Sequence, residues 1–357
     1  MSRLAPALVA GLLCVRASLA QDLPTSSLET WPGVALPEGA VTGADEQSVT
    51  VRPHDPAEPI LALGWHQIRS IPPTLADDHR PSAEAGRAIW RAGVRLDRGD
   101  HAGALALLEP LEDRYRGRPG PTSVAYFRAL LRARLARLDR PSASRAWLEL
   151  RAVSETDPGP EPQLVPLYAS GPVPARAPGA PEDDPIAEAH AIAGLVDHAT
   201  QAGLAPRADA LFARVSADDP FERLHAAVVG ADLGSPDVRV DARDELADLA
   251  VSDNTYRGTW ARLATARSLS READDLSRRL AIAAFVEVSI RDQGVAPILA
   301  GFALAEAAVA AQRNADPSSA QTLAAEFRER FPCHPANLTL PGALEAARQS
   351  TPSENDA

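Results

Sequence analysis

The chain has 357 residues, a formal net charge of −12 and 36 lysine-plus-arginine residues, every one of which is arginine. The absence of lysine excludes P-loop nucleotide hydrolases, protein kinases, Schiff-base enzymes and Ser-Lys hydrolases, because their chemistry needs a lysine amine. The acidic balance argues against nucleic acid or an anionic membrane as the main partner. Aromatic residues make up 4% of the chain and hydrophobic residues 45%. The core must therefore consist mostly of alanine, leucine and valine, which favours closely packed helices.

Residues 1–20 have the composition of a secretory signal peptide. Arg3 precedes an apolar run over 4–15, and a small-x-small cleavage pattern ends at Ala20. The run is too short to span a bilayer, which takes about 20 residues. We therefore expect export to the periplasm or the exterior, with cleavage near Ala20. The one cysteine that would remain, Cys333, has no partner for an internal disulfide.

Residues 21–80 carry eight prolines, which exclude long helices and central strands. We expect a mostly irregular, proline-rich N-terminal arm here. Its one candidate strand is short and lies around Val49 to Val51. The segment 60–71 is apolar enough to dock on another part of the protein.

Helical spacing of apolar residues begins near Pro81 and defines an N-terminal helical block over 81–156. The first helix is expected to begin near Ser82. The second is expected over 102–115, with a kink at Pro110 inside it. Two further helices complete the block.

Nine prolines over 157–185 predict a linker between this block and a C-terminal helical block over 186–349. In the second block the apolar segment 295–312 resembles a membrane span, but Glu306 lies within it. A carboxylate is costly at the centre of a bilayer, so we predict a buried helix instead. Residues 350–357 are predicted to form a disordered tail.

Several helix starts in the C-terminal block are marked by a capping side chain directly before a proline, which fits the first turn of a helix. These predicted caps are Asp184, Asp219, Ser235 and Asp316. Asn254 is expected to cap the helix that contains Trp260.

Three helix pairs resemble tetratricopeptide repeats, in which the two helices of a unit of about 34 residues cross at small residues beside large apolar ones. The segments 192–220 and 304–332 fit best, and the pair 89–111 fits with one residue fewer in its turn. The resemblance implies an all-α fold of stacked antiparallel helical hairpins, a tetratricopeptide-like α-solenoid. The residues at the packing positions are Ile89, Gly93, Leu96, Ala104, Leu108, Ile192, Leu195, Gly203, Ala208, Phe212, Pro220, Leu304, Ala308, Ala320 and Pro332.

The predicted repeats depart from the family in their spacing. The crossing-point alanines Ala104, Ala208 and Ala320 are 104 and 112 residues apart, which are not multiples of the repeat length. The resemblance is therefore to a degenerate array. Another all-α fold, either a bundle or an α/α toroid, is the alternative.

The histidines, the acidic residues near them and the cysteine do not have the spacing of a known catalytic or metal-binding motif. His190 and Asp197 are seven residues apart rather than four, and His198 faces another side of the predicted helix, so we expect surface residues rather than zinc ligands. Cys333 and His334 are neighbours in a proline-flanked stretch, where adjacent side chains point apart, which disfavours a catalytic nucleophile.

The remaining candidates are weaker still. The acids Asp183 and Asp184 fall in the predicted linker, where a general acid would be too solvated for its pKa to rise. His54, His66 and His79 lie in the arm without ligand spacing. We therefore predict no catalytic site, no metal site and no cofactor.

One local charge anomaly stands out in this acidic chain. Between residues 121 and 151, seven arginines occur against only two acidic residues. Guanidinium groups bind carboxylates and phosphates well, so this segment is a candidate docking patch for an anionic partner. Alternatively, it is a solvated face whose arginines pair with acids elsewhere in the fold. The seven are Arg128, Arg132, Arg134, Arg137, Arg140, Arg145 and Arg151.

These observations predict an exported, non-catalytic helical-repeat scaffold that binds a protein or peptide partner in the cell envelope, since stacked hairpins leave a concave surface for an extended peptide or a helix. An anionic envelope polymer is a possible partner. Two alternatives stay open: an α/α-helical enzyme that acts on an envelope polysaccharide, and a structural subunit of an envelope complex. The enzyme would need clustered carboxylates, at least one with a raised pKa.

Overall fold

The computed structural model describes residues 23–137, 139–154, 184–193, 201–215 and 219–350. The predicted signal peptide, almost all of the predicted linker and almost all of the predicted tail lie outside these residues. Contacts within the chain divide it after Arg87 into two compact units.

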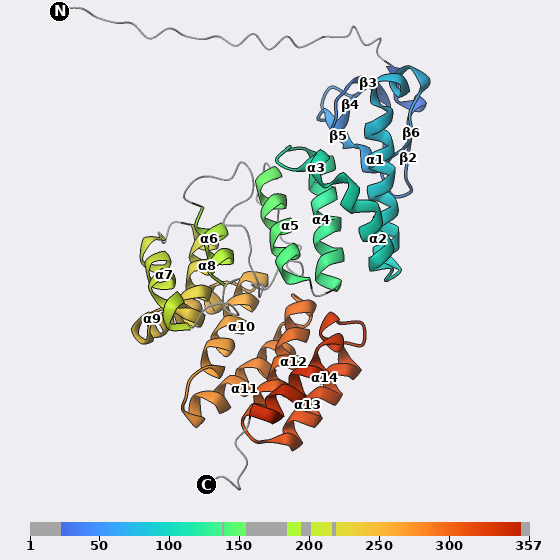
Figure 1. The fold of residues 1–357 in the computed structure, drawn as a ribbon. Helices are drawn as coiled ribbons and strands as arrows, with labels where there is room; N and C mark the ends of the chain where they lie inside the picture. Colours follow the sequence, from blue (N-terminus) through green and yellow to red (C-terminus); the bar gives the residue numbers. More distant parts are fainter. Residues whose placement is uncertain (1–22, 138, 155–183, 194–200, 216–218, 351–357) are drawn as a thin grey trace, which may run out of the picture. The chain divides into compact units, whose positions relative to one another are not determined.

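The first unit contains two antiparallel β-sheets rather than an irregular arm. One sheet has the strand order β1-β3-β4-β5, and the other pairs β2 with β6 (Figure 1). The strands are β1 (Leu23–Pro24), β2 (Glu29–Thr30), β3 (Gly39–Ala44), β4 (Ser48–Pro53), β5 (Leu61–Gly64) and β6 (Ile68–Ser70). Two short 3-10 helices, η1 (Thr25–Ser27) and η2 (Trp65–Gln67), connect strands.

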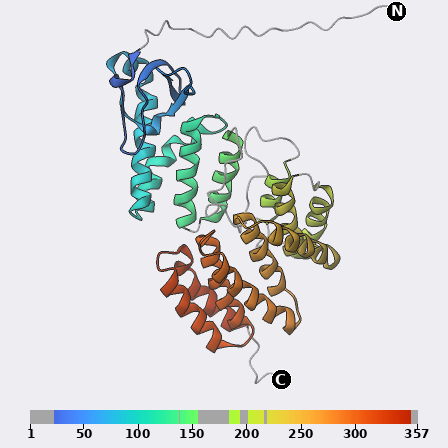
Figure 2. The ribbon, with the colours of Figure 1, turned by 180° about the vertical axis from the view of Figure 1, so that it is seen from behind.

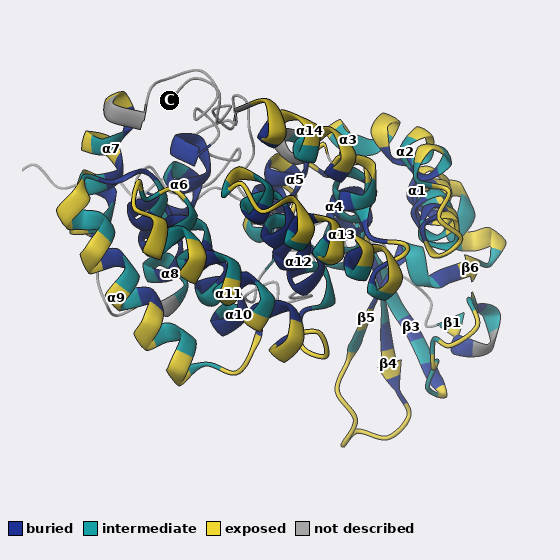
Figure 3. Cartoon of the chain, turned by 90° about the horizontal axis from the view of Figure 1, so that it is seen from below, coloured by how far each residue is buried: buried dark blue, intermediate teal, exposed yellow. Residues whose placement is uncertain are grey.

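The expectation of an irregular arm is wrong because the prolines fall where short strands tolerate them. Pro24 and Pro53 each end a strand, and further prolines lie in the exposed connection between β4 and β5 (Figure 3). The predicted strand at Val49 to Val51 is confirmed as the middle of β4. Alternation along β4 places both valines in a core with Trp65, since all three side chains are fully buried.

The first helix, α1 (Pro73–Asp97), begins earlier than predicted and holds Pro81 in its interior. A proline inside a helix removes one backbone hydrogen bond, which is why the sequence favours a start near Ser82. Burial of Ala85 and Ile89, four residues apart on one face of α1, offsets that loss. Tertiary packing therefore extends the helix through the proline.

Within the described residues the second unit is helical. Pro110 interrupts the second predicted helix, as expected, and forms part of the 3-10 helix η3. The N-terminal elements of this unit are α2 (His101–Leu108), η3 (Glu109–Leu111), α3 (Glu112–Tyr115), α4 (Pro121–Ala136) and α5 (Arg140–Val153). The C-terminal elements are α6 (Pro185–Ala193), α7 (Gln201–Arg214), α8 (Pro220–Leu233), α9 (Pro236–Ser252), α10 (Tyr256–Ser270), α11 (Asp275–Arg291), α12 (Pro297–Arg313), α13 (Pro317–Arg330), η4 (Pro335–Leu338) and α14 (Leu340–Ser350).

The helices from α6 onward contact one another in a regular order. Each consecutive pair from α6 to α13 is in contact, and Figures 1 and 2 both show α11, α12 and α13 side by side. In addition, α6, α8, α10 and α12 each contact the next even-numbered helix. Alanine-rich faces allow this close approach, as on α12, where Ala300, Ala303 and Ala307 are fully buried.

Most of the predicted helix starts are confirmed. Three predicted caps accept hydrogen bonds from first-turn N–H groups: Asp184, Asp219 and Asp316. Ser235 makes no such bond; its own N–H donates to Asp209 Oδ1 at 2.9 Å. The cap of α10 is Thr255 rather than Asn254, because the Thr255 hydroxyl accepts a hydrogen bond from an N–H group in the first turn of the helix.

The predicted repeat-packing residues have mixed surroundings. Those that are buried are Ile89, Leu96, Ala104, Leu108, Ile192, Ala208, Leu304, Ala308 and Ala320. Gly203 is not in a turn as predicted, since it lies exposed inside α7, and Pro220 begins α8. Gly93 and Phe212 are half-buried, Pro332 follows α13, and Leu195 lies outside the described residues.

Of the helices in the described ranges, none combines the length and the hydropathy that a membrane span needs.

Candidate functional site

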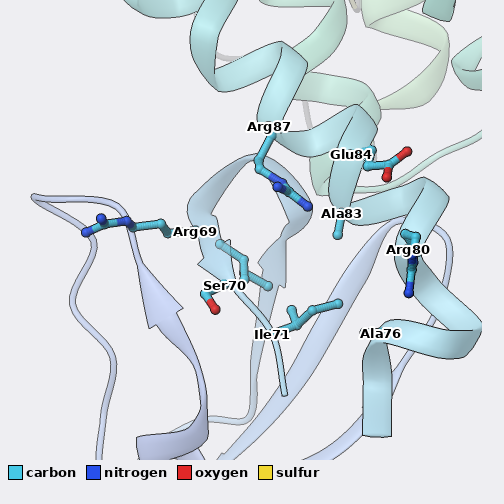
Figure 4. A pocket seen from close by; sticks show the side chains of 9 residues that line it. Arg69, Ser70, Ile71, Ala76, Arg80, Ala83, Glu84 and Arg87 are labelled. Atoms are coloured by element: carbon cyan, nitrogen blue, oxygen red, sulfur yellow. The ribbon is translucent and has the colours of Figure 1, made fainter. Parts of the chain in front are cut away.

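An arginine-lined pocket of about 290 Å³ lies in the first unit, between β6 and α1. Figure 4 shows Arg87 reaching toward Ile71, with Arg80 and Ala83 on the helix beside them, whereas Arg69 extends away from the other two arginines. The lining residues are Ile68, Arg69, Ser70, Ile71, Ala76, Arg80, Ala83, Glu84 and Arg87.

The helix side of the pocket follows from residue spacing along α1. Ala76, Arg80, Ala83 and Arg87 are separated by four, three and four residues, so they share one helix face. Gly86 lets the helix approach the sheet closely, because a Cβ atom at that position would lie 2.4 Å from the Trp65 backbone. The sequence therefore brings two arginines and two small residues against the end of β6.

The strand side supplies an apolar wall and one further guanidinium group. Ile68 is buried and Ile71 half-buried. Arg69 is partly engaged already, since its Nε lies 4.0 Å from Glu29 and its guanidinium carbon lies 5.9 Å from the centre of the Trp31 ring. Arg69 is therefore less available for a ligand than the two arginines of the helix.

Arg80 and Arg87 are exposed, and neither forms an ion pair with any residue in the described part of the chain. Glu84 lies one turn from both and, among these described residues, pairs with neither. The unit around them is acidic, because residues 23–87 contain nine acids and only four arginines. Two guanidinium groups beside an apolar wall can hold a carboxylate or phosphate that carries an apolar neighbour.

Sequence reasoning missed this pocket because it placed the start of the helix after Arg80. The spacing of Arg80 and Arg87, seven residues apart with Ala83 between them, is visible in the sequence. It becomes a signal only once α1 is known to run through Pro81.

The predicted patch over 121–151 is partly used inside the fold. Arg132 pairs with Asp97 at 3.1 Å, and Arg151 contacts both oxygens of Asp184 at 2.7 and 2.8 Å. Arg134 lies 3.7 Å from Glu112 and 3.5 Å from Asp139. Arg137 and Arg145 are exposed and Arg128 is half-buried. The side chain of Arg140 is not among those that the structure describes.

His190 is buried, not on the surface as predicted. Its ring stacks on Trp147 of α5, with 5.1 Å between ring centres, and lies 5.7 Å from the ring of His225 on α8. Trp147 also stacks on His225 at 5.5 Å. Burial lowers the pKa of His225 to about 4 and holds the pKa of His190 well below its ordinary value. Two neutral imidazoles therefore help to join α5 to α6 and α8.

Asp184 also departs from its predicted setting. Its side chain is 4% exposed, accepts the Arg151 guanidinium and caps α6, so it is not the solvated linker residue that we expected. Asp183, Asp197 and His198 lie outside the described residues.

Cys333 and His334 do not form a catalytic pair. Cys333 is exposed, whereas His334 is buried and uses both ring nitrogens. Nε2 lies 2.9 Å from the Ile298 carbonyl oxygen, and Nδ1 accepts from the Ala336 N–H at 3.1 Å. This imidazole is therefore a helix-capping group with no nitrogen left to act as a base.

Of the three histidines in the predicted arm, His79 packs against an aromatic side chain: its ring stacks on that of Trp65, with 5.7 Å between the ring centres. Among the residues that the structure describes, no group of three or more His, Cys, Asp or Glu side chains is placed to hold a metal ion. Comparisons of the chain with protein-family models, curated proteins and solved structures found no match.

Proposed function

We propose that the protein is an exported, non-catalytic helical-repeat scaffold, and that it binds an acidic segment of a protein or peptide partner in the pocket between β6 and α1. The single observation that carries this proposal is the pair Arg80 and Arg87, two exposed guanidinium groups without acidic partners in the described part of the chain, beside an apolar wall. A carboxylate with a neighbouring aliphatic group satisfies both features, as an acidic peptide does.

The order of helix contacts supports the scaffold part of the proposal. In a tetratricopeptide-like α-solenoid, one helix of each hairpin packs on the equivalent helix of the next hairpin. The contacts from α6 through α8, α10 and α12 to α14 have this order, and α7, α9 and α11 each contact the helices before and after them in the chain. We propose that these helices form such a solenoid.

Among the described residues, burial raises the pKa of three carboxyl groups, those of Glu149, Glu222 and Asp232, and this favours the enzyme alternative. Burial raises the pKa of Asp232, on α8, and the charge of Glu306, on α12, adds to that rise. Asp232, however, lies 2.8 Å from Arg271 Nε, and Glu306 accepts from Arg267 Nε at 2.7 Å. Carboxylates held by arginines are suited to joining helices, so we favour the binding function over hydrolysis of a polysaccharide.

The test is a binding titration with a defined probe, a fluorescently labelled peptide that contains glutamate and leucine residues. Arg80→Gln and Arg87→Gln remove the charges but keep most of each side chain. We expect each to weaken binding by about tenfold or more, because a charge-assisted hydrogen bond contributes roughly 1.5–3 kcal/mol.

The matched control is Arg91→Gln, which removes one charge from an exposed position of the same helix outside the pocket. This variant should bind like the wild type. Equal binding by all three variants, with helical circular dichroism unchanged, would rule out the pocket. If the protein bound an anionic polysaccharide but not the peptide, the partner would be a polysaccharide rather than a protein or peptide.

A further inference from the structure

An apolar stripe runs along the outer face of α11. Leu276, Leu280 and Ile290 are 67%, 50% and 64% exposed, although they are large aliphatic residues. They lie on one helix face with Ala283 and Glu287, at spacings of four, three, four and three residues. Large apolar side chains arranged in this way on a protein surface mark a contact with another helix.

The stripe is not the face through which α11 packs in its own chain. The buried residues Ala281, Phe285 and Val288 lie on another side of the helix and contact the core. The helix thus has two apolar faces, and neighbouring helices α10 and α12 cover only one of them. At a rise of about 1.5 Å per residue, the exposed stripe from Leu276 to Ile290 is about 21 Å long.

We propose that this stripe, Leu276–Ile290 of α11, binds the same stripe of a second copy in an antiparallel pair with its two-fold axis at Ala283. Under this symmetry, a residue that precedes Ala283 lies at the same height as the residue of the second copy that follows Ala283 by an equal number. Leu276 then meets Ile290 of the second copy, and the small Ala283 allows the helices to approach at the centre.

The charges on α11 identify a second copy as the occupant. Arg279 and Glu287 lie four residues on either side of Ala283 and have opposite sign. Asp275 and Arg291 lie eight residues on either side and also have opposite sign. Antiparallel pairing therefore places opposite charges at equal heights at every one of these positions, and the symmetry repeats each pair. A parallel pair would place like charges together instead.

The inner two of these charges, Arg279 and Glu287, are available for such contacts, whereas Asp275 already pairs with Arg278 of its own helix. Arg279 is exposed and forms no ion pair within the described residues. Glu287 contacts Arg291 of its own helix only at 3.9 Å, with both side chains about half-exposed or more. An exposed pair of this kind contributes little, so a contact with the second copy replaces it at low cost.

The experiment measures the mass of the full chain by sedimentation velocity over a range of concentrations. We expect a reversible dimer. Arg279→Glu and Glu287→Arg should each weaken dimerisation by about tenfold or more, because each turns two attractions into repulsions. Arg328→Glu on α13, which changes an exposed arginine away from the stripe, should dimerise like the wild type.

The two single variants also test the geometry. One variant carries glutamate at both positions and the other carries arginine at both, so each repels its own copies but attracts the other variant. A mixture of the two should therefore form a heterodimer, although neither variant dimerises well alone. The double variant R279E/E287R should likewise recover the dimer. A monomeric wild type would overturn the proposal, as would a wild-type dimer that the single charge reversals leave unchanged.

Discussion

Arg262 on α10 shows why arginine can take over a buried cationic role inside the helical unit. Its side chain is 10% exposed and binds both oxygens of Asp292, each at 2.8 Å, while its third nitrogen donates to the Ala250 carbonyl at 2.7 Å. A lysine amine offers no planar fork for such a bidentate contact. Arg151 likewise reaches both oxygens of Asp184. The lysine-free composition is thus compatible with well-satisfied buried charges.

The buried imidazoles have the opposite requirement, since they must stay neutral. Arg151, Asp184 and Asp219 are the charged groups that act on His225, but burial is the largest effect on its pKa. The folded state lowers this pKa to about 4, whereas an unfolded chain has a histidine pKa of about 6.5. The unfolded state therefore binds more protons between these values, and stability falls as the pH falls through this window.

We expect the free energy of unfolding to drop by about 2–3 kcal/mol from the His225 contribution as the pH falls from about 7 to about 4.5. Urea denaturation at the two pH values measures this. His225→Phe keeps an aromatic ring beside Trp147 and should lose that part of the pH dependence. The control His54→Gln, on the exposed β4–β5 connection, should keep it. An unchanged pH dependence in the phenylalanine variant would contradict the prediction.

At the scale of elements, the packing of α1 on the strands holds the first unit together. The helix runs through Pro81 because its apolar face packs on the strands, and Gly86 sits where any larger residue would meet the Trp65 backbone. Gly93, in the same helix, has nothing within 4 Å of the position where a Cβ atom would lie. Gly93 occupies a predicted packing position, but the close approach of α1 to the strands is at Gly86.

Substitution of the two glycines by alanine should change the stability of the protein in opposite directions. Glycine to alanine inside a helix normally stabilises it by about 0.5–1 kcal/mol, so we expect Gly93→Ala to raise the melting temperature slightly. Gly86→Ala should lower stability by about 1–3 kcal/mol instead, because the rigid backbone of Trp65 must move away. Thermal unfolding followed by circular dichroism compares them. Stabilisation by both substitutions would show that α1 does not pack closely on the strands.

At the scale of the whole molecule, the net charge of −12 opposes the proposed acidic ligand at long range, whereas Arg80 and Arg87 attract it at short range. Salt screens the two effects differently, because the Debye length is about 10 Å at 0.1 M ionic strength. Long-range repulsion should therefore limit the rate at which an acidic peptide arrives, and the local ion pairs should limit the rate at which it leaves.

We accordingly expect both rate constants to rise with added salt. Stopped-flow anisotropy with the acidic peptide, at ionic strengths of about 0.05 and about 0.3 M, measures the association and dissociation rate constants separately. Arg87→Gln should increase the dissociation rate constant, whereas Arg91→Gln should leave it unchanged. An association rate constant that falls with salt would mean that the arginines dominate the field even at a distance.

Short-range signals in the sequence predicted most of the helical unit. Aspartate before proline marks helix starts at positions such as Asp219 and Asp316 because capping and the fixed proline backbone act within one turn. Pro110 interrupts its helix for the same local reason. The strand at Val49 to Val51 is likewise confirmed, since a short run of β-branched residues is a local signal.

What only the tertiary structure decided depends on contacts between residues far apart in the chain. Strand pairing is such a contact, so the two sheets of the first unit could not be read from a proline-rich sequence. The burial of His190 beside Trp147 and the pairing of Asp184 with Arg151 arise in the same way. So does the pocket in which Arg80 and Arg87 lie with Ile71. Composition and local spacing determined that the protein is mostly helical, because helix formation is local. The pocket, in contrast, exists only because tertiary packing extends α1 past Pro81 and places it against β6.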